Sequence, residues 1–430
     1  MNFQRQFRHP LLVLVSLLTT SVTLFGQAIS GQIVSAQGEA MESVSVALND
    51  DMNNASATFS DGSYRFWTLP TADNYVVKPF KTELNHLNGV STYDLVLITR
   101  HILGTQPFAN SFQMVAADTD ASGTITTFDV IKLRKLILRI DENFTHTTPW
   151  RFVDANYTFP GTSPSSLPDF PQQRELNSED PDANAVDFIG VKMGDVNGSA
   201  KVNNIITPDE RNNEISVLHI NPQLTGSEFV ATFSTSDLSI YSAVQFTINF
   251  DPDQLAFRGI QALKMTGLTE DNLGLEQLTA GKITLSWHTT DALSFGKDDK
   301  LFALNFTALQ RGNPAVTVTS DVTAALAYNR EGLEIQLASQ TAASDREIPV
   351  VVTPNPVANV ATVSFNGQAT SAVLSVYDLK GQLLKTYQHD ATPGLNQIRL
   401  RRADFPTQGA VIYQLITGQQ TVGGKLLLLD

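Results

Sequence analysis

Short apolar runs that alternate with polar residues dominate this chain and predict β-strands. The clearest run covers residues 243–251, where Val244, Phe246, Ile248 and Phe250 alternate with polar side chains. This period of two predicts a strand with one buried face. Similar apolar runs recur at 229–233, 283–287, 301–309 and 316–318. The pattern therefore predicts a mainly β protein.

One region departs from this alternation and predicts a helix. Val130, Leu133, Ile137 and Ile140 follow one another at spacings of 3, 4 and 3 residues. Such spacing places the four side chains on one face of a helix that begins just after Asp129.

The twelve residues before this helix have the spacing of a calcium loop. Oxygen-bearing residues fill loop positions 1, 3, 5, 7, 9 and 12, and Gly123 stands at position 6, where the chain must turn sharply. Calcium prefers six to eight oxygen ligands, which such a loop supplies. The alternative is a solvated turn. The predicted ligands are Asp118, Asp120, Ser122, Thr124, Thr126 and Asp129.

A similar loop–helix unit lies earlier in the chain, but its loop matches the calcium pattern less well. Residues 88–98 align with 122–133, and Asp94 takes the place of Asp129. Glu83, Asn85 and Asn88 match the remaining loop positions only approximately. Further on, Asp195, Asn197 and Ser199 repeat the 1-3-5 oxygen pattern, but position 12 is Ile206. These residues form either a plain turn or, as a sharper hypothesis, a segment by which Asp195 and Asn197 complete the site of Asp94.

A calcium loop and helix repeated within residues 82–140 resembles the dockerin modules of polysaccharide-degrading bacteria. Dockerins fold around two calcium sites and bind cohesin modules with their helices. The resemblance implies an EF-hand-like calcium-binding domain over residues 81–200, calcium as the cofactor and a cohesin-bearing partner. Within this region, residues 159–184 are predicted to be an extended loop or linker because Pro, Ser and Asn are frequent.

Two flanking segments are predicted to be β-sandwiches. Residues 29–80 contain short apolar runs separated by turns such as Asp61-Gly62, and resemble the prealbumin or carboxypeptidase-regulatory-like modules that act as spacers. The strand order of residues 213–340 resembles cohesin domains, a jelly-roll sandwich related to carbohydrate-binding modules. A cohesin-like module implies a dockerin-bearing partner, and the presence of both modules suggests pairing between chains or an internal dock.

The two ends of the chain indicate export. Residues 1–28 carry Arg5 and Arg8, then an apolar stretch and small residues at a cleavage position, as in a signal peptide. Residues 346–430 contain Pro354-Asn355-Pro356 and end with a Gly-Lys-Leu-Leu motif, which resembles the type A sorting domain of the type IX secretion system. The gap between Gly409 and Tyr413 is longer than usual in that family. These features imply the type IX machinery as a partner and an extracellular or cell-surface location, with no transmembrane segment.

Charge and composition narrow the function further. The formal net charge is −14, which argues against nucleic acids and anionic membrane surfaces as partners. The chain has no cysteine, so disulfides and zinc-thiolate sites are excluded. Seven scattered histidines and the lack of a nucleophile motif give no indication of an enzyme.

The sequence therefore predicts a multidomain, mainly β protein with three β-sandwich modules and a small calcium-binding helical domain. We expect a non-enzymatic surface protein that assembles through dockerin–cohesin contacts in polysaccharide utilisation. The alternative is a carbohydrate-binding accessory protein or adhesin that uses the cohesin-like sandwich. Trp287, next to His288, would be its sugar platform, although a core position is expected for Trp287, and also for Trp67 and Trp150.

Overall fold

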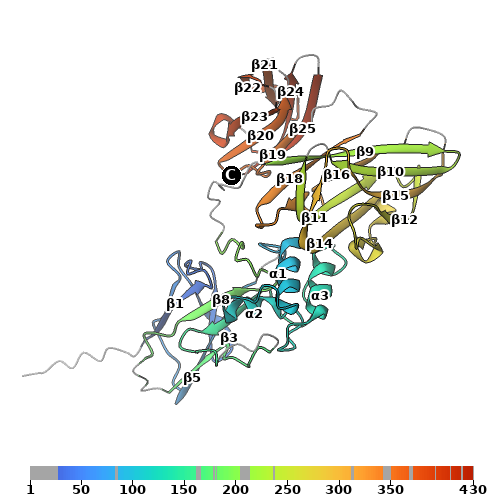
Figure 1. Cartoon of the computed structure of the whole chain (residues 1–430). Helices are drawn as coiled ribbons and strands as arrows, with labels where there is room; N and C mark the ends of the chain where they lie inside the picture. Colours follow the sequence, from blue (N-terminus) through green and yellow to red (C-terminus); the bar gives the residue numbers. More distant parts are fainter. Residues whose placement is uncertain are drawn as a thin grey trace, which may run out of the picture.

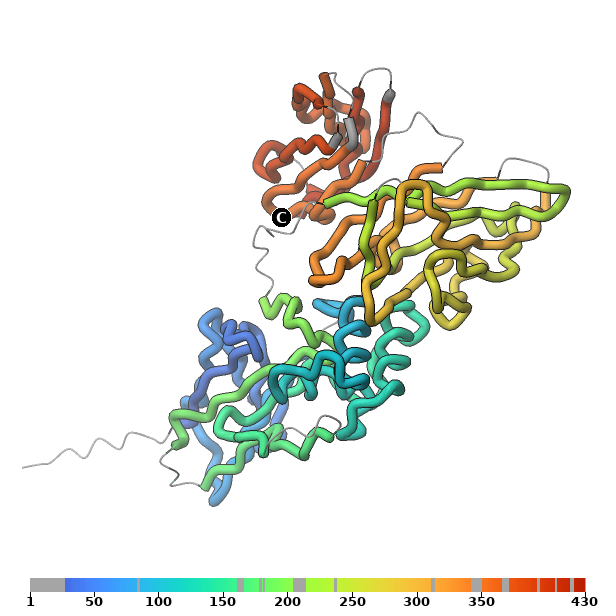
Figure 2. The backbone as a smooth tube through the Cα atoms, in the orientation of Figure 1, coloured from blue at the N-terminus to red at the C-terminus, as the bar shows by residue number. Residues whose placement is uncertain are grey.

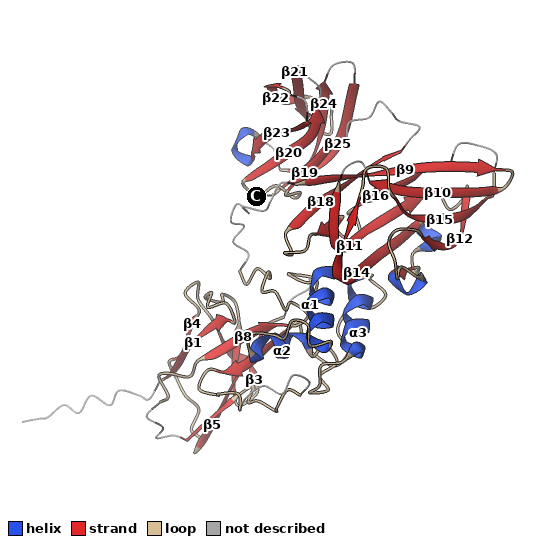
Figure 3. Ribbon diagram, viewed as in Figure 1, coloured by secondary structure: helices blue, strands red, loops and turns tan. Residues whose placement is uncertain are grey.

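The structure, a computed structural model, describes residues 28–429 apart from several internal gaps. These gaps cover 83–85, 161–165, 178–179, 181, 204–213, 236–237, 311–313, 342–349, 368–370, 393, 407 and 418–419. Far more of the described residues lie in strands than in helices (Figure 3), as predicted. The predicted signal peptide, 1–28, lies almost wholly outside the described residues. Among the described residues, none of the helices has the length and apolar character needed to span a bilayer.

The N-terminal module is a sandwich of two four-stranded sheets with a common apolar core. Its first sheet has the order β4-β1-β8-β6, with β1 and β8 parallel. These strands are β4 Ser63–Phe66, β1 Ile29–Ser35, β8 Phe188–Lys192 and β6 Trp150–Asp154. The second sheet contains β3 Asp51–Ala57, β2 Ser45–Leu48, β5 Asn74–Phe80 and β7 Arg174–Asn177 in that order.

The expected boundary after residue 80 is therefore wrong, because three later strands complete this sandwich. The chain leaves it after β5, builds the helical region and returns to it through β6, β7 and β8, as Figure 2 shows. Strand β7 lies inside the predicted linker 159–184 and pairs with β5. A buried ion pair between Arg174 and Asp154 joins β7 to β6. The prediction failed because none of the three closing strands has an alternating apolar run long enough to be recognised.

Three helices form the central region: α1 Thr92–Ile102, α2 Ser111–Ala117 and α3 Thr127–Ile137. A capping box begins α1 at Ser91 and α3 at Thr126, in which the third helical residue is an aspartate. Val130, Leu133 and Ile137 are buried as predicted. Ile140 lies beyond the end of α3, so the helix is shorter than expected.

The second sandwich follows, and nine of its ten described strands form one continuous hydrogen-bonded path, in the order β12-β15-β10-β9-β18-β17-β11-β14-β13, while β16 pairs with β11 outside that path. Its core contains Trp287, Phe246 and Phe302. Figure 1 shows α1 and α3 between this module and the N-terminal sandwich. The strands are β9 Ile215–Thr225, β10 Glu228–Thr235, β11 Ser239–Phe250, β12 Leu255–Ala262, β13 Leu273–Gly274, β14 Lys282–Phe295, β15 Lys300–Ala308, β16 Val316–Thr319, β17 Leu326–Tyr328 and β18 Glu334–Thr341, with short 3₁₀ turns at Glu270–Asn272 and Leu278–Ala280.

The C-terminal module has a three-stranded and a four-stranded sheet, in the orders β19-β20-β23 and β22-β21-β24-β25. Side chains of both sheets, including Phe365 and Leu415, share one core. Its elements are β19 Val350–Thr353, β20 Val360–Gly367, β21 Ser371–Tyr377, β22 Leu383–Asp390, β23 Gly394–Arg401, a 3₁₀ turn at Arg402–Asp404, β24 Gly409–Thr417 and β25 Gln420–Leu428.

Candidate functional site: two carboxylate loops and a helix–sheet interface

The loop before α3 brings its three predicted carboxylates together. One oxygen from each of Asp118, Asp120 and Asp129 lies within 4.8 Å of the others. Ser122 lies beside them, because its N–H donates to Asp118 Oδ1 at 2.8 Å and to Asp120 Oδ1 at 3.1 Å, and its hydroxyl donates to the Thr124 carbonyl at 3.2 Å. Position 9 behaves differently, since the Thr126 hydroxyl accepts from the Phe128 N–H as the helix cap. The loop therefore gathers hard oxygen donors, as the spacing predicts.

Backbone donors and burial set the electrostatics of this loop. The Ser122 and Gly123 N–H groups donate to Asp118, and the Thr119 and Thr126 N–H groups donate to Asp129. Burial still raises the pKa of Asp118, and it raises the pKa of Asp129 to about 6. Converging carboxylates that are hard to ionise alone gain most from a bound cation.

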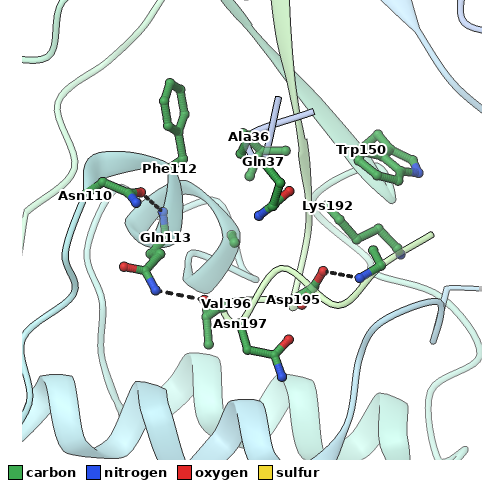
Figure 4. A pocket seen from close by; sticks show the side chains of 13 residues that line it. Ala36, Gln37, Asn110, Phe112, Gln113, Trp150, Lys192, Asp195, Val196 and Asn197 are labelled. Atoms are coloured by element: carbon green, nitrogen blue, oxygen red, sulfur yellow. Dashed lines mark hydrogen bonds between the residues drawn. The ribbon is translucent and has the colours of Figure 1, made fainter. Parts of the chain in front are cut away.

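The predicted site around Asp94 is completed by a segment that lies about 100 residues later in the sequence. Residues 195–200 pass in front of the first turn of α1, and the N–H groups of Val196 and Asn197 donate to Asp94 Oδ1 at 2.9 and 3.4 Å. Asp195 and Asn197 line the same small cavity, of about 220 Å³, between this segment and α2 (Figure 4). The structure thus places Asp94, Asp195 and Asn197 together, in the arrangement of the sharper hypothesis.

We call residues 195–199 together with 89–94 the split loop, and residues 118–129 the continuous loop. The hydrogen bonds of the split loop match those of the continuous loop position by position. Ser199 N–H donates to Asp195 Oδ1 at 3.0 Å, as Ser122 N–H does to Asp118 Oδ1 at 2.8 Å. The Ser199 hydroxyl donates to the Gly89 carbonyl at 2.9 Å, as the Ser122 hydroxyl does to its position-7 carbonyl. Positions 1, 3 and 5 thus come from residues 195–199, and positions 7 to 12 from residues 89–94.

The two halves meet at close range, and their two carboxylates, Asp94 and Asp195, are buried. A Cβ on Gly89, whose φ is +73°, would stand 2.4 Å from the Ala200 backbone, so only glycine fits there. Burial, and then the charge of Asp195, raises the pKa of Asp94 well above its usual value. Of the residues first considered for this site, Asn88 instead bonds to the Lys201 backbone. Glu83 and Asn85 lie outside the described residues.

Helices α1 and α3 lie on the sheet formed by β11 and β14 of the second sandwich. Thr92 donates its N–H to Gln245 Oε1 at 2.7 Å, and its hydroxyl lies 2.8 Å from the Ser286 hydroxyl. At the other end of α1, Arg100 Nε donates to the Thr290 carbonyl at 2.9 Å. The residues that these first two bonds connect lie 153 and 194 positions apart in the sequence.

Two threonine hydroxyls of the second sandwich contact the carbonyls at the end of α3. Thr323 Oγ1 donates to the Ile137 carbonyl at 2.9 Å, and Thr284 Oγ1 donates to the Leu138 carbonyl at 2.6 Å. The final carbonyls of a helix have no partner within the helix, so these hydroxyls satisfy groups that would otherwise be buried unpaired. From the start to the end of α1, its contacts on β14 move from Ser286 to Thr290. From the start to the end of α3, they move in the opposite direction along β14. The two helices therefore lie antiparallel to each other on this strand.

An apolar cluster fills the space between α1 and the sheet. It comprises Tyr93, Val96, Ala243 and Tyr328, all buried. The Tyr93 and Tyr328 rings stack with their centroids 5.6 Å apart. Gly332, at φ +83°, lets the chain approach, because a Cβ there would lie 2.3 Å from the Tyr93 ring. The interface therefore combines a packed apolar centre with hydrogen-bonded edges, as stable protein interfaces do.

His288 lies between both helices at the centre of the polar contacts. Its Nε2 is 3.1 Å from Thr99 Oγ1 of α1, and its Nδ1 is 3.3 Å from Arg134 Nη2 of α3. Burial, and then the charge of Arg134, lowers the pKa of His288 to about 3. The sequence singled out this residue only as a neighbour of Trp287, so its position in the interface was missed.

The three tryptophans differ in exposure. Trp287 is 1% exposed and its indole N–H donates to the Thr266 carbonyl at 3.0 Å, so it is a core residue and not a sugar platform. Trp150 is also buried, in the core of the N-terminal sandwich. Trp67 is 77% exposed, which contradicts its expected role in packing.

Comparison with solved structures gives similarities to cohesins at low identity. The seventh ScaB type I cohesin of Pseudobacteroides cellulosolvens is 11% identical, covering 30% of this chain and 88% of its own, with a TM-score of 0.25. The type II cohesin dyad from the ScaA scaffoldin of Acetivibrio cellulolyticus is 10% identical, covering 48% and 89%, with a TM-score of 0.24. Scores this low carry no argument about function. A search of curated protein sequences found no match.

The C-terminal module has a clear relative among protein families. Residues 351–428 match the family model described as the secretion system C-terminal sorting domain. This range agrees with the predicted module, 346–430, and confirms the resemblance that the Pro-Asn-Pro motif suggested. Residues 351–428 are therefore a sorting domain, which indicates that the chain is secreted to the cell surface.

Proposed function

We propose that this chain is an exported, non-enzymatic surface protein in which calcium-held helices dock on a β-sandwich, in the manner of dockerin–cohesin assembly. The observation that carries the proposal is the interface of α1 and α3 with β11 and β14. It combines a buried Tyr93–Tyr328 stack with hydrogen bonds at both ends of α1. The sorting domain supports its location at the cell surface.

Calcium is the cofactor that the donor sets fit. Asp118, Asp120, Ser122, Asp129 and the Thr124 carbonyl supply the continuous loop with oxygen alone, which suits a hard cation. When bound, calcium would supply the positive charge that these converging carboxylates lack. Thr126 fits less well, because its hydroxyl caps α3.

The split loop would hold a second calcium ion. Asp94, Asp195, Asn197, Ser199 and the Gly89 carbonyl occupy the places of their counterparts in the continuous loop. With two carboxylates instead of three, this loop is expected to bind more weakly, because fewer charges attract the ion. A bound ion would fasten two segments that lie about 100 residues apart.

The split loop also connects calcium to docking. Asp94 is the third residue of α1, and Thr92, two residues before it, contacts Gln245 and Ser286 of the sheet. An ion that fixes the Asp94 carboxylate would therefore fix the turn that carries these contacts. We propose that calcium stabilises the docked arrangement by ordering the start of α1.

The interface lies within one chain, and the same surfaces would serve a dockerin- or cohesin-bearing partner if the internal dock opened. This internal docking is the arrangement that we propose for the isolated protein. The runner-up, a polysaccharide bound by the second sandwich, loses its best candidate because Trp287 is in the core. A role in polysaccharide utilisation remains part of the proposal only through the dockerin-like resemblance.

Isothermal titration of calcium into the full chain tests the proposal. We expect two bound ions, one lost in Asp118→Ala and the other in Asp195→Ala. Asp253→Ala, which removes an exposed carboxylate of the second sandwich, is the matched control and should keep both. A chain that binds no calcium at millimolar concentration would contradict the proposed cofactor, and an unchanged stoichiometry in Asp195→Ala would contradict the split site.

A further inference from the structure

The N-terminal sandwich carries an exposed aromatic row that neither the calcium loops nor the interface uses. Trp67 is 77% exposed and Phe59 is 65% exposed. Between them in sequence lies Arg65, whose guanidinium carbon stands 4.7 Å from the Trp67 ring centroid. Each of the three follows a buried residue in the segment 58–67, which follows β3 of one sheet and contains β4 of the other. The buried neighbours are Thr58, Tyr64 and Phe66.

The row is extended and lies at a sheet edge. Strand β4 pairs with β1 on one side only, so it is the edge of its sheet. Phe59 N–H donates to the Ser63 carbonyl at 2.9 Å, which places Phe59 beside Ser63, four residues before Trp67. Trp67 follows the last residue of β4, so at the strand rise per residue the backbone positions of the two aromatic residues are about 13 Å apart. This separation is longer than one sugar ring and suits a linear ligand that contacts both.

The charge of the row is unusual for this protein. The chain has a formal net charge of −14, which opposes polyanionic ligands over the surface as a whole, so a site for such a ligand needs a local cation. In the described part of the N-terminal sandwich, ion pairs join Lys78 to Asp50 and Arg174 to Asp154, and Arg65 makes none. The Arg65 guanidinium lies over the Trp67 ring, and the residue is exposed. A guanidinium carries a planar fork of N–H donors that matches a carboxylate.

An aromatic face and an adjacent cation recognise two different parts of one ligand. The face of an indole carries partial negative charge, which attracts the C–H groups on the flat side of a pyranose ring. A carboxylate on the same sugar chain would pair with the guanidinium. Exposed apolar groups gathered in one place commonly mark a binding site.

We propose that Phe59, Arg65 and Trp67 bind an acidic polysaccharide, with uronate residues along the edge of β4. One sugar ring stacks on the open face of the Trp67 indole, a carboxylate of the polymer pairs with Arg65, and Phe59 contacts a ring further along. This site uses no residue of the proposed calcium-held interface, so the polysaccharide site and the proposed docking can be tested independently.

Titration of the full chain with oligogalacturonate, and in parallel with a neutral cello-oligosaccharide of equal length, tests this site. Both titrations contain chelator, because uronates bind calcium themselves. We expect micromolar to millimolar binding of the uronate, weakened at least tenfold in Trp67→Ala and at least fivefold in Arg65→Gln. Met52→Ala removes another exposed apolar side chain of the same sandwich and should leave binding unchanged.

Three results would overturn the proposal. They are no uronate binding by the unaltered chain, retained binding in Trp67→Ala, and equal affinity for the neutral oligosaccharide. Because Trp67 and Arg65 are exposed, circular dichroism of both variants should match that of the unaltered chain, so a loss of binding cannot be assigned to misfolding. The calcium stoichiometry of Trp67→Ala should still be two if the proposed function holds.

Discussion

Acid should weaken the helix–sheet interface through one residue, His288. Arg134 can only donate, so the His288 Nδ1 that faces it at 3.3 Å must be the acceptor. The proton of the neutral ring then lies on Nε2 and points to Thr99 Oγ1 at 3.1 Å. Protonation would place a second N–H against the guanidinium and a second positive charge in a half-buried site.

The size of the effect follows from the change in pKa. A solvent-exposed imidazole has a pKa of about 6.5, whereas burial and Arg134 lower that of docked His288 to about 3. Because the docked pKa is the lower one, docking is strongest above pH 6.5 and is lost progressively as the pH falls toward the docked value. Linkage gives docking about 30-fold weaker at pH 5 than at pH 7.5, or about 2 kcal/mol.

Hydrogen exchange of α1 and β14 in the full chain, corrected for the intrinsic pH dependence of exchange, measures this loss. His288→Gln is the control, because its carbonyl accepts from Arg134 and its amide donates to Thr99 without titrating. Protonation of the carboxylates in both loops also affects docking at low pH, but this contribution is the same in His288→Gln as in the unaltered chain. An acid loss of the same size in His288→Gln would refute the role of His288.

Three further substitutions have distinct expected outcomes. Gly332→Ala would place a Cβ 2.3 Å from the Tyr93 ring, so protection of α1 in hydrogen exchange should fall by about 2 kcal/mol or more. Gly89→Ala would push apart the halves of the split loop, and calorimetry should show the weaker calcium site at least tenfold weaker, with the other site unchanged. Arg151 Nη1 lies 3.5 Å from Asp118 Oδ2, so Arg151→Gln should remove a competing cation and raise the affinity of the continuous loop about threefold to tenfold; a lower affinity would contradict this reasoning.

Local sequence spacing was enough to predict the continuous loop. Asp118, Asp120 and Asp129 lie within twelve residues, so the turn at Gly123 and the helix start bring them together with no help from the rest of the fold. The mainly β class and the C-terminal module followed for the same reason, because alternation and turn motifs are local signals.

Features made by distant segments were harder to predict. The split loop joins Asp94 to Asp195 across the return of the chain through β6, β7 and β8, and only the 1-3-5 pattern at residue 195 suggested it. The closing strands of the N-terminal sandwich left no clear pattern, so its boundary was misplaced. No sequence feature distinguished His288 from other histidines on strands, because its role depends on two helices from another module.

Exposure was the other property that the sequence did not show. Tyr93 and Val96 of α1 are buried against the sheet, whereas their repeat counterparts Phe128 and Ile131 of α3 are 50% and 45% exposed. Equivalent residues of the two repeats thus differ in exposure, because only the first turn of α1 lies on the sheet. Trp67 was expected in the core for a similar reason, since alternation alone does not tell which face is covered.

The most direct test of the account is hydrogen exchange of the full chain at neutral pH, with calcium and with chelator. We predict that chelation accelerates exchange in α1 and in the facing part of β14 together, and that Asp195→Ala has the same effect in the presence of calcium. Unchanged protection of both elements after chelation would contradict the claim that calcium holds the helices on the sheet.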